Sequence, residues 1–164
     1  MATSTSTSTI RLLHHLVDQA YSRPAWHGPN LRNSLRGLTA AQASWRPAAG
    51  RHNIWEIMLH AAYWKYIGCR RLLGGEVVPF AHKGTNWFAS PESADAKVWR
   101  QDLNLLEHMH REFRKALDQA RDRDLNRPAR GSKQSNLEII MGVATHDLYH
   151  AGQIRMLRRL LPGR

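Results

Sequence analysis

Four segments of the chain carry apolar residues at the i, i+3, i+4, i+7 spacing of an amphipathic helix. The pattern predicts helices from about Thr9 to Tyr21, Asn53 to Leu73, Ser90 to Arg121 and Ser135 to Leu161. Each segment begins with a residue type that caps helix N-termini, and in the second and fourth a glutamate follows three positions later, as in a capping box. No run of alternating polar and apolar residues is long enough to predict a strand, so we expect an all-α fold.

The segments between these helices are rich in proline, glycine and asparagine and predict loops. A capping box at Thr39 and Gln42 predicts one or two helical turns in the first connection, and residues 76–90 are expected to form a long crossover loop. Long connections after the first and second helices favour a four-helix bundle other than the simple up-down-up-down kind. Residues 1–8 are interpreted as a disordered Ser/Thr-rich tail and residues 9–164 as a single domain.

The composition excludes several classes of protein. No segment is apolar over the length of a membrane span, and the Ser/Thr-rich start has neither the basic nor the apolar part of a secretory signal. The single cysteine, Cys69, excludes an internal disulfide and favours a reducing, cytoplasmic location. The net charge of +11 suggests nucleic-acid binding, but the 19 arginines and five lysines are scattered without a placed cluster, so solvated surface charge is the favoured interpretation.

The fourth predicted helix places His146, His150 and Gln153 on one face. Apolar and small residues share that face: Ile139, Gly142, Val143 and Leu157. The imidazoles are therefore expected to point into the bundle. A second apolar stripe lies on the opposite side of this helix: Leu137, Met141, Ala144, Leu148 and Ala151. A helix with two apolar faces, one of them containing small residues, suits contact with a second subunit, and we predict a homodimer.

His60 lies on an apolar face of the second predicted helix, from which it can meet His146 and His150 inside one bundle. Three neutral imidazoles in an apolar cavity each need a hydrogen-bond partner, and a divalent metal ion removes that need by binding one nitrogen lone pair of each ring. The outer N–H groups would then donate to acceptors such as Glu56 or Gln153. Three protein ligands leave coordination positions open, as in a reactive site rather than a structural one.

Plainer interpretations stay open beside the metal site. Each histidine can be a hydrogen-bonded core residue, and His52 lies beside a loop from which it can approach a cavity mouth. Asp147 projects away from the imidazole face and is interpreted as a surface residue, and Cys69 as a buried structural thiol. Four aromatic residues are candidates for a pocket wall, although such positions are more often core: Trp26, Tyr63, Trp64 and Trp87.

Three stretches of the chain bear on family membership: WHGPNLRNSLRGLTAAQASWRP, WRPAAGRHNIWEIMLHAAYW and THDLYHAGQIRMLRRLL. Their distinctive feature is one histidine followed, about eighty-five residues later, by the pattern HxxxHxxQ. Together they resemble the DinB-like superfamily of metalloenzymes, over nearly all of the chain after the Ser/Thr tail. One departure is His52-Asn53, where relatives often carry Trp-Ser, and the effect of His52 on the pocket is left open.

The resemblance implies an up-down-down-up four-helix bundle, commonly a homodimer, with a three-histidine divalent metal site that carries over to His60, His146 and His150. In this superfamily the metal is usually zinc or nickel, and a water often completes its coordination. Characterised relatives include transferases and isomerases that use low-molecular-weight thiols.

The leading hypothesis is therefore a metal-dependent enzyme that activates a small thiol or water toward a small-molecule substrate, in the manner of a thiol S-transferase. A metal-dependent hydrolase is one alternative, and a non-catalytic dimeric metal- or ligand-binding stress protein is another. The sequence identifies neither the metal nor the substrate, because imidazole suits several divalent metals.

Overall fold

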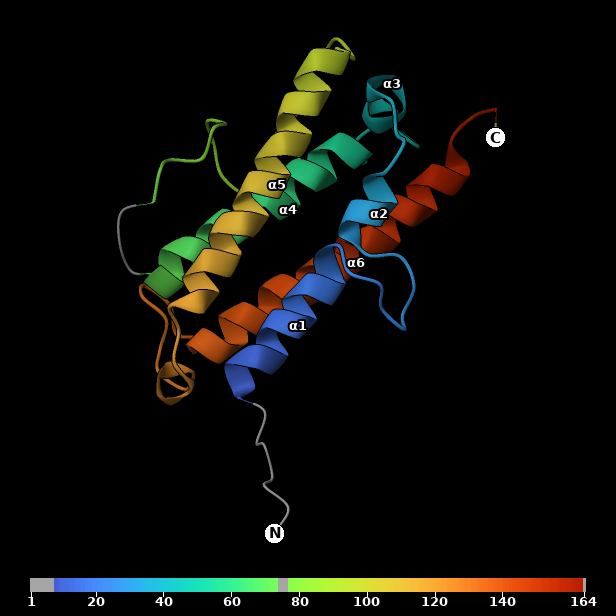
Figure 1. The fold of residues 1–164 in the computed structure, drawn as a ribbon. Helices are drawn as coiled ribbons and strands as arrows, with labels where there is room; N and C mark the ends of the chain where they lie inside the picture. The colour runs from blue at the N-terminus through green and yellow to red at the C-terminus, as the bar shows by residue number, and fades with distance from the viewer. Residues whose placement is uncertain (1–7, 74–76, 164) are drawn as a thin grey trace.

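The computed structural model describes residues 8–73 and 77–163 (Figure 1). The helices are α1 (Thr9–Tyr21), α2 (Leu31–Leu35), α3 (Ala40–Ser44), α4 (Ile54–Leu73), α5 (Ala96–Asp118) and α6 (Asn136–Leu160), with a 3-10 turn at Asp122–Asp124. The described residues contain no strand, so the prediction of an all-α fold is confirmed.

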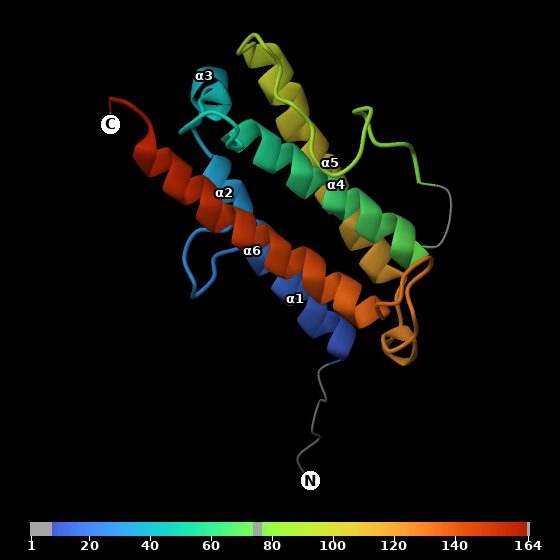
Figure 2. The ribbon, with the colours of Figure 1, turned by 180° about the vertical axis from the view of Figure 1, so that it is seen from behind.

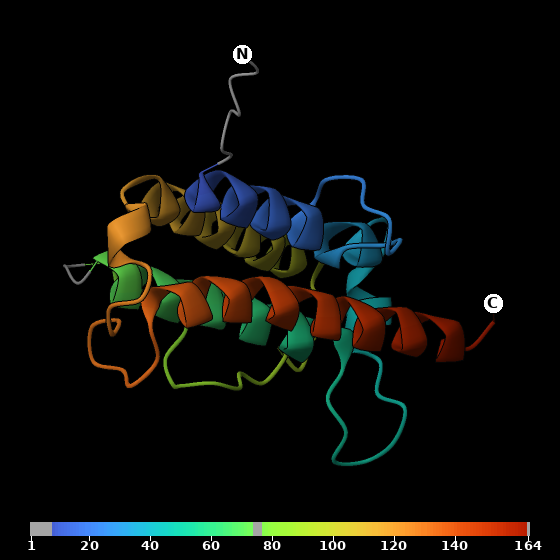
Figure 3. The same cartoon turned by 90° about the horizontal axis from the view of Figure 1, so that it is seen from below.

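The long helices α1, α4, α5 and α6 form the body of the molecule. α1 and α6 lie side by side and run in one direction, while α4 and α5 run in the opposite direction (Figures 1 and 2), which is the up-down-down-up order. α4 packs against both α5 and α6, and α1 packs against α6 and α5, as seen from below in Figure 3. α2 contacts α6 and α3 contacts α4, so the two short helices cover one end of the bundle.

Capping side chains fix the starts of three helices as the sequence predicted. Reciprocal capping boxes begin α3 and α6, through Thr39 with Gln42 and Ser135 with Glu138. Asn53 caps α4 by accepting a hydrogen bond from the amide of Glu56 at 2.9 Å. The carboxylate of Glu56 does not return to Asn53, since it binds Arg46 instead.

The start of α5 corrects the prediction of a helix from Ser90. α5 begins after Asp95, whose carboxylate accepts hydrogen bonds from the amides of Lys97 at 2.6 Å and Val98 at 3.0 Å. Ser90 is tied to the start of α4, where its hydroxyl accepts a hydrogen bond from Asn53 Nδ2 at 2.8 Å. The crossover between α4 and α5 is therefore longer than predicted.

The start of α1 is capped from a distant part of the chain rather than by Thr9. The carboxylate of Asp122 accepts hydrogen bonds from the amides of Thr9 and Ile10, at 3.3 and 3.1 Å. The predicted disordered tail falls on residues outside the described part of the chain, apart from Ser8, whose hydroxyl also donates to Asp122. The segment after α5 thus holds the first turn of α1.

The hydrophobic core follows α4. Trp55, Met58 and Leu59 have no exposed surface. At Gly68 the backbone of α4 approaches α5 so closely that a Cβ atom there would lie 2.7 Å from a ring carbon of Phe113. Within the described residues, no helix has the length and hydropathy needed to cross a membrane.

A buried ion pair joins α4 to α6 and corrects the interpretation of Asp147 as a surface residue. Lys65 Nζ binds Asp147 Oδ2, and the two side chains are 0% and 1% exposed. Lys65 Nζ also lies 4.9 Å from the ring centre of Tyr21 on α1. Asp147 is buried because α6 packs against α1 as well as against α4.

The second apolar stripe predicted on α6 is divided between core and surface. Ala144 and Ala151 are buried within the chain itself, whereas Met141 is 44% exposed. The exposed large apolar side chains of α6 are Met141, Tyr149, Met156 and Leu160. A homodimer through this surface stays a prediction. Cys69 is buried as predicted, and its burial raises the pKa of the thiol to about 12.

Candidate metal centre

Three histidine side chains from two helices converge on one point. α4 contributes His60, and α6 contributes His146 and His150 one helical turn apart. Nε2 of His146 lies 3.1 Å from Nε2 of His60 and 2.9 Å from Nε2 of His150. One ligand nitrogen from each ring lies within 4.8 Å of the others. The predicted meeting of the three imidazoles is therefore present in the structure.

The outer nitrogens of two of the rings have acceptors that fix their tautomers. His60 Nδ1–H donates to the backbone carbonyl of Asn86 at 2.7 Å, and His150 Nδ1–H donates to Gln153 Oε1 at 2.7 Å. Gln153 is oriented in turn by donating from Nε2 to the hydroxyl of Tyr149 at 3.0 Å. Because carbonyl oxygens can only accept, the protons sit on Nδ1, and each Nε2 presents a lone pair to the common point.

This arrangement fits a divalent metal ion better than it fits metal-free imidazoles. The Nε2 lone pairs of His60 and His150 both face Nε2 of His146, which carries at most one proton and can satisfy only one of them. A buried lone pair without a donor costs free energy. A cation at the common point would accept all three lone pairs, with the Nδ1–H groups already held from outside.

Burial keeps the three rings neutral, which is the form that binds metal. Burial is the largest cause of a lowered pKa for each ring, and the neighbouring imidazoles add to it. The pKa of His146 falls to about 3 and that of His150 to about 4, and the pKa of His60 is also lowered. At neutral pH protons therefore do not compete with a metal for these nitrogens.

Asn86 is a part of the site that the sequence did not reveal. It has a positive φ of 66°, a left-handed conformation that asparagine adopts more readily than most residues. In this conformation its backbone carbonyl accepts from His60, while its side-chain oxygen accepts from Trp64 Nε1 at 3.0 Å. The crossover loop thus provides the acceptor for His60 that was predicted to come from Glu56.

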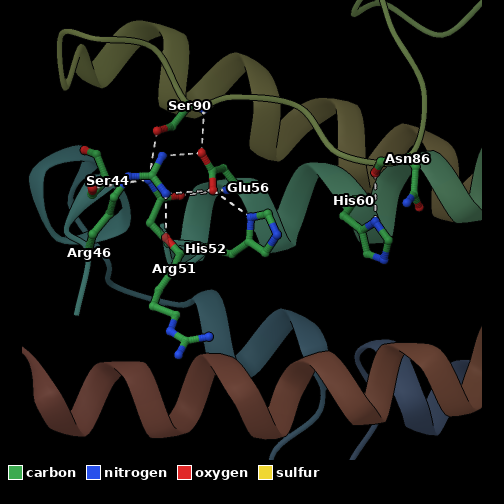
Figure 4. A network of polar contacts seen from close by, with 9 residues as sticks. Ser44, Arg46, Arg51, His52, Glu56, His60, Asn86 and Ser90 are labelled. Carbon is green, nitrogen blue, oxygen red and sulfur yellow. Dashed lines mark hydrogen bonds and ion pairs between the residues drawn. The ribbon is translucent and has the colours of Figure 1, made fainter. Parts of the chain in front are cut away.

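Glu56 belongs to a separate network at the start of α4 (Figure 4). Its carboxylate accepts hydrogen bonds from the guanidinium of Arg46, from His52 Nδ1 at 2.9 Å and from the amide of Ser90 at 3.4 Å. Burial alone would raise the pKa of Glu56, but these donors outweigh it and hold the pKa below its ordinary value. Figure 4 shows His60 beyond this network, extending from α4 toward α6.

The Glu56 network reaches the metal centre through a stack of rings. His52 stacks on Trp87 with the ring centres 3.7 Å apart, and Trp87 stacks on His60 with the centres 3.9 Å apart. His52, whose role the sequence left open, therefore positions Trp87 against the ring of His60. Both contacts depend on the crossover loop, which brings Trp87 to the end of α4 where His52 lies.

Two cavities meet at the histidines. The first, which we name the Arg71 cavity, has a volume of about 370 Å³ and extends from His60 and His146 to Arg71. The second, the Tyr149 cavity, has a volume of about 740 Å³ and is bordered by all three histidines, Trp87 and Tyr149. Both volumes suit small-molecule ligands. The common point of the imidazoles is accordingly reached from two sides.

The aromatic candidates for the pocket wall have different positions. Trp64 lines the Arg71 cavity and Trp87 lines the Tyr149 cavity. Tyr63 packs instead in a group of rings with Phe80 and Phe88, at centre distances of 5.4 and 5.3 Å. Trp26 is fully exposed in the loop between α1 and α2, so it contributes to neither of these two cavities.

The geometry of the site agrees with comparisons of the whole chain. A sequence profile of the DinB superfamily matches residues 23–154, which include all three histidines. The chain belongs to the DinB superfamily. The predicted family is thereby confirmed, together with the all-α fold.

A solved structure supports the same fold for this DinB-superfamily protein. The crystal structure of a conserved protein from Enterococcus faecalis is similar with a TM-score of 0.68, covering 97% of this chain and 100% of the other. The two sequences are 19% identical, so the likeness concerns the fold alone. Comparison with curated proteins gave no significant match.

Proposed function

We propose that this protein is an enzyme that uses a divalent metal ion, zinc or nickel, to activate a small thiol or water toward a small-molecule substrate. The observation that carries the proposal is the convergence of three neutral imidazoles, two buried and that of His146 half-buried, whose Nε2 lone pairs face one point. A metal bound there would lower the pKa of a thiol or water placed on it and so supply a nucleophile at neutral pH. Three protein ligands leave room for that group.

The surrounding residues of the chain would orient the ligands and shape the approach. The Asn86 carbonyl and Gln153 Oε1 hold the rings of His60 and His150 with Nε2 facing inward. Trp87 covers one face of His60 and limits the access of water to it. Cys69 is no alternative nucleophile, since it borders neither cavity and its burial raises the pKa of its thiol to about 12.

Two cavities at one centre favour transfer between two substrates over hydrolysis. A transferase must bring a nucleophile and an electrophile to the same point, and the Arg71 and Tyr149 cavities both border His60 and His146. Hydrolysis needs space for only one organic substrate. We therefore place thiol transfer ahead of a hydrolase, and expect the protein to work as a cytoplasmic homodimer.

The test is thiol transfer by zinc- or nickel-loaded protein that carries no histidine tag. Chlorodinitrobenzene would be offered with cysteine or glutathione, and a nitrophenyl ester without thiol would report hydrolysis. We expect thiol-dependent turnover that His60→Ala abolishes and that His108→Ala, which changes an exposed histidine of α5, leaves intact. Thiol-independent ester cleavage would favour the hydrolase. Metal binding without either activity would favour the non-catalytic binding protein.

A further inference from the structure

The Arg71 cavity has a charged end that metal binding does not explain. Its walls are apolar along Ile67, Ile139 and Val143, and Arg71 is the one cationic residue among its described lining residues. The side chain of Arg71 makes no hydrogen bond or ion pair with the described part of the chain. Glu138 also borders the cavity, but its carboxylate is bound by Ser135 within the capping box.

The cavity extends along three turns of α4 from the histidine centre to Arg71. His60 and Arg71 are eleven residues apart, which corresponds to about 16 Å along a helix axis. Long side chains on a helix lean toward its N-terminus, so the guanidinium of Arg71 lies closer to the histidines than its backbone does. About 10 Å then separates the guanidinium from the histidines. A molecule of that length would touch the histidines with one end and Arg71 with the other.

Gly142 keeps the opposite wall of the cavity open. It lies on α6, facing the cavity, and a Cβ atom built at this position would meet nothing within 4 Å. The glycine is therefore not required by close helix packing, in contrast to Gly68 on α4. A larger side chain at Gly142 would enter the space between His146 and Arg71 without displacing the core.

We propose that the Arg71 cavity binds a small molecule with an anionic end and an apolar body. The guanidinium of Arg71 binds the anionic group, the body lies along Ile67 and Val143, and the other end reaches the histidines. This assignment rests on the proposed function only for the reaction at the histidine end. Binding of the anion at Arg71 does not itself require a metal.

The test compares ω-mercaptooctanoate with the matched neutral mercaptooctanol by calorimetry on zinc-loaded protein. We expect Arg71→Gln to weaken binding of mercaptooctanoate by about tenfold or more and to leave mercaptooctanol unchanged, because only the carboxylate bonds the guanidinium. Arg70→Gln is the matched control. Arg70 is the exposed neighbour of Arg71, its guanidinium lies 5.8 Å from the ring centre of Tyr66, and it should affect neither ligand.

A second pair of variants tests the location without changing charge. Gly142→Met should weaken both ligands by filling the cavity, whereas Gly152→Met, at an exposed and equally open glycine of α6, should weaken neither. Equal losses for Arg71→Gln and Arg70→Gln would show general attraction to a basic protein and overturn the proposal. The proposal would also be overturned if Gly142→Met has the melting temperature of the wild type and still binds both ligands as tightly as the wild type does.

Octanoate binding to metal-free protein separates this proposal from the proposed function. Octanoate has no thiol, so its binding reports on the cavity alone. If Arg71→Gln weakens the binding of octanoate, while protein loaded with zinc or nickel shows no turnover, the cavity assignment stands and the enzymatic proposal fails. If thiol transfer proceeds and neither mercaptooctanoate nor octanoate depends on Arg71, the enzymatic proposal stands and the cavity assignment fails.

Discussion

Replacing Lys65 by methionine should destabilise the protein strongly, because it leaves the carboxylate of Asp147 buried without its cation. Both side chains are almost completely buried, and Asp147 Oδ1 has no hydrogen-bond partner among the described residues. Breaking a buried ion pair by removing one partner costs about 3–5 kcal/mol. The loss of stability has a similar upper limit, because Asp147 can take up a proton instead of remaining charged. Neutralising an ordinary aspartate at pH 7 costs about 4 kcal/mol.

The pH dependence of this loss gives the prediction its specificity. In the wild type, burial raises the pKa of Asp147 to about 6 although Lys65 opposes the shift, so the pair is charged above pH 6. In Lys65→Met the folded state would hold a proton on Asp147 that the unfolded state releases, so its stability rises as the pH falls. As the pH falls from 8 to 6, the difference in the free energy of unfolding between the wild type and Lys65→Met should decrease by about 2 kcal/mol.

Urea denaturation of chelator-treated protein, followed by far-UV circular dichroism, measures both effects. Asp147→Leu combined with Lys65→Met should recover most of the lost stability, because replacing a buried ion pair with apolar residues is often neutral or better. If Lys65→Met unfolds with a free energy within about 1 kcal/mol of the wild type, the ion pair does not stabilise the protein as a buried pair, since exposed pairs contribute no more than that. A double variant no more stable than Lys65→Met would also contradict the predicted cost of leaving Asp147 unpaired.

Three further predictions follow from single positions. Asn86→Val should weaken zinc affinity by about tenfold or more while Asn86→Gly retains most of it, since valine disfavours the left-handed backbone that aims the carbonyl at His60; competition with a zinc chelator measures this. Gly68→Ala should lower the free energy of unfolding by about 1–3 kcal/mol, and the matched Gly142→Ala should not, as judged by urea denaturation. Burial lowers the pKa of His110 to about 2, so only the unfolded state gains a proton there below pH 6.5. Between pH 7 and pH 5, the free energy of unfolding of His110→Phe should therefore fall by about 2 kcal/mol less than that of the wild type. An equal fall in both proteins would contradict the burial of a neutral His110.

The bounds of most helices could be predicted from the sequence, because the helices are amphipathic and their caps are residues adjacent to them in the chain. The apolar spacing placed α1, α4 and α6 within a residue or so of their observed bounds, and the capping boxes marked the starts of α3 and α6. It failed at the start of α5, where Ser90 looks like a cap but bonds Asn53 and Glu56 across the chain. Local sequence cannot distinguish a cap from a tertiary contact of the same side chain.

The part of the site that depends only on residue spacing along a helix could be predicted from the sequence. The histidine face of α6 and the facing His60 follow from spacing, and Gln153 lies one turn from His150 as its acceptor. The acceptor for His60 did not follow, because it is a backbone carbonyl whose direction depends on the φ angle of Asn86. Nor did the burial of Asp147, because the wheel of one helix does not show that a second neighbour covers its other side.

X-ray absorption at the zinc edge, on protein purified without a histidine tag and reconstituted with zinc, measures whether His60, His146 and His150 bind one metal ion together. We expect one metal per chain with three imidazole nitrogens at about 2.0–2.1 Å, and loss of that metal in His146→Ala. A wild-type chain that binds no stoichiometric metal, or a His146→Ala variant that keeps the same nitrogen shell, would contradict it.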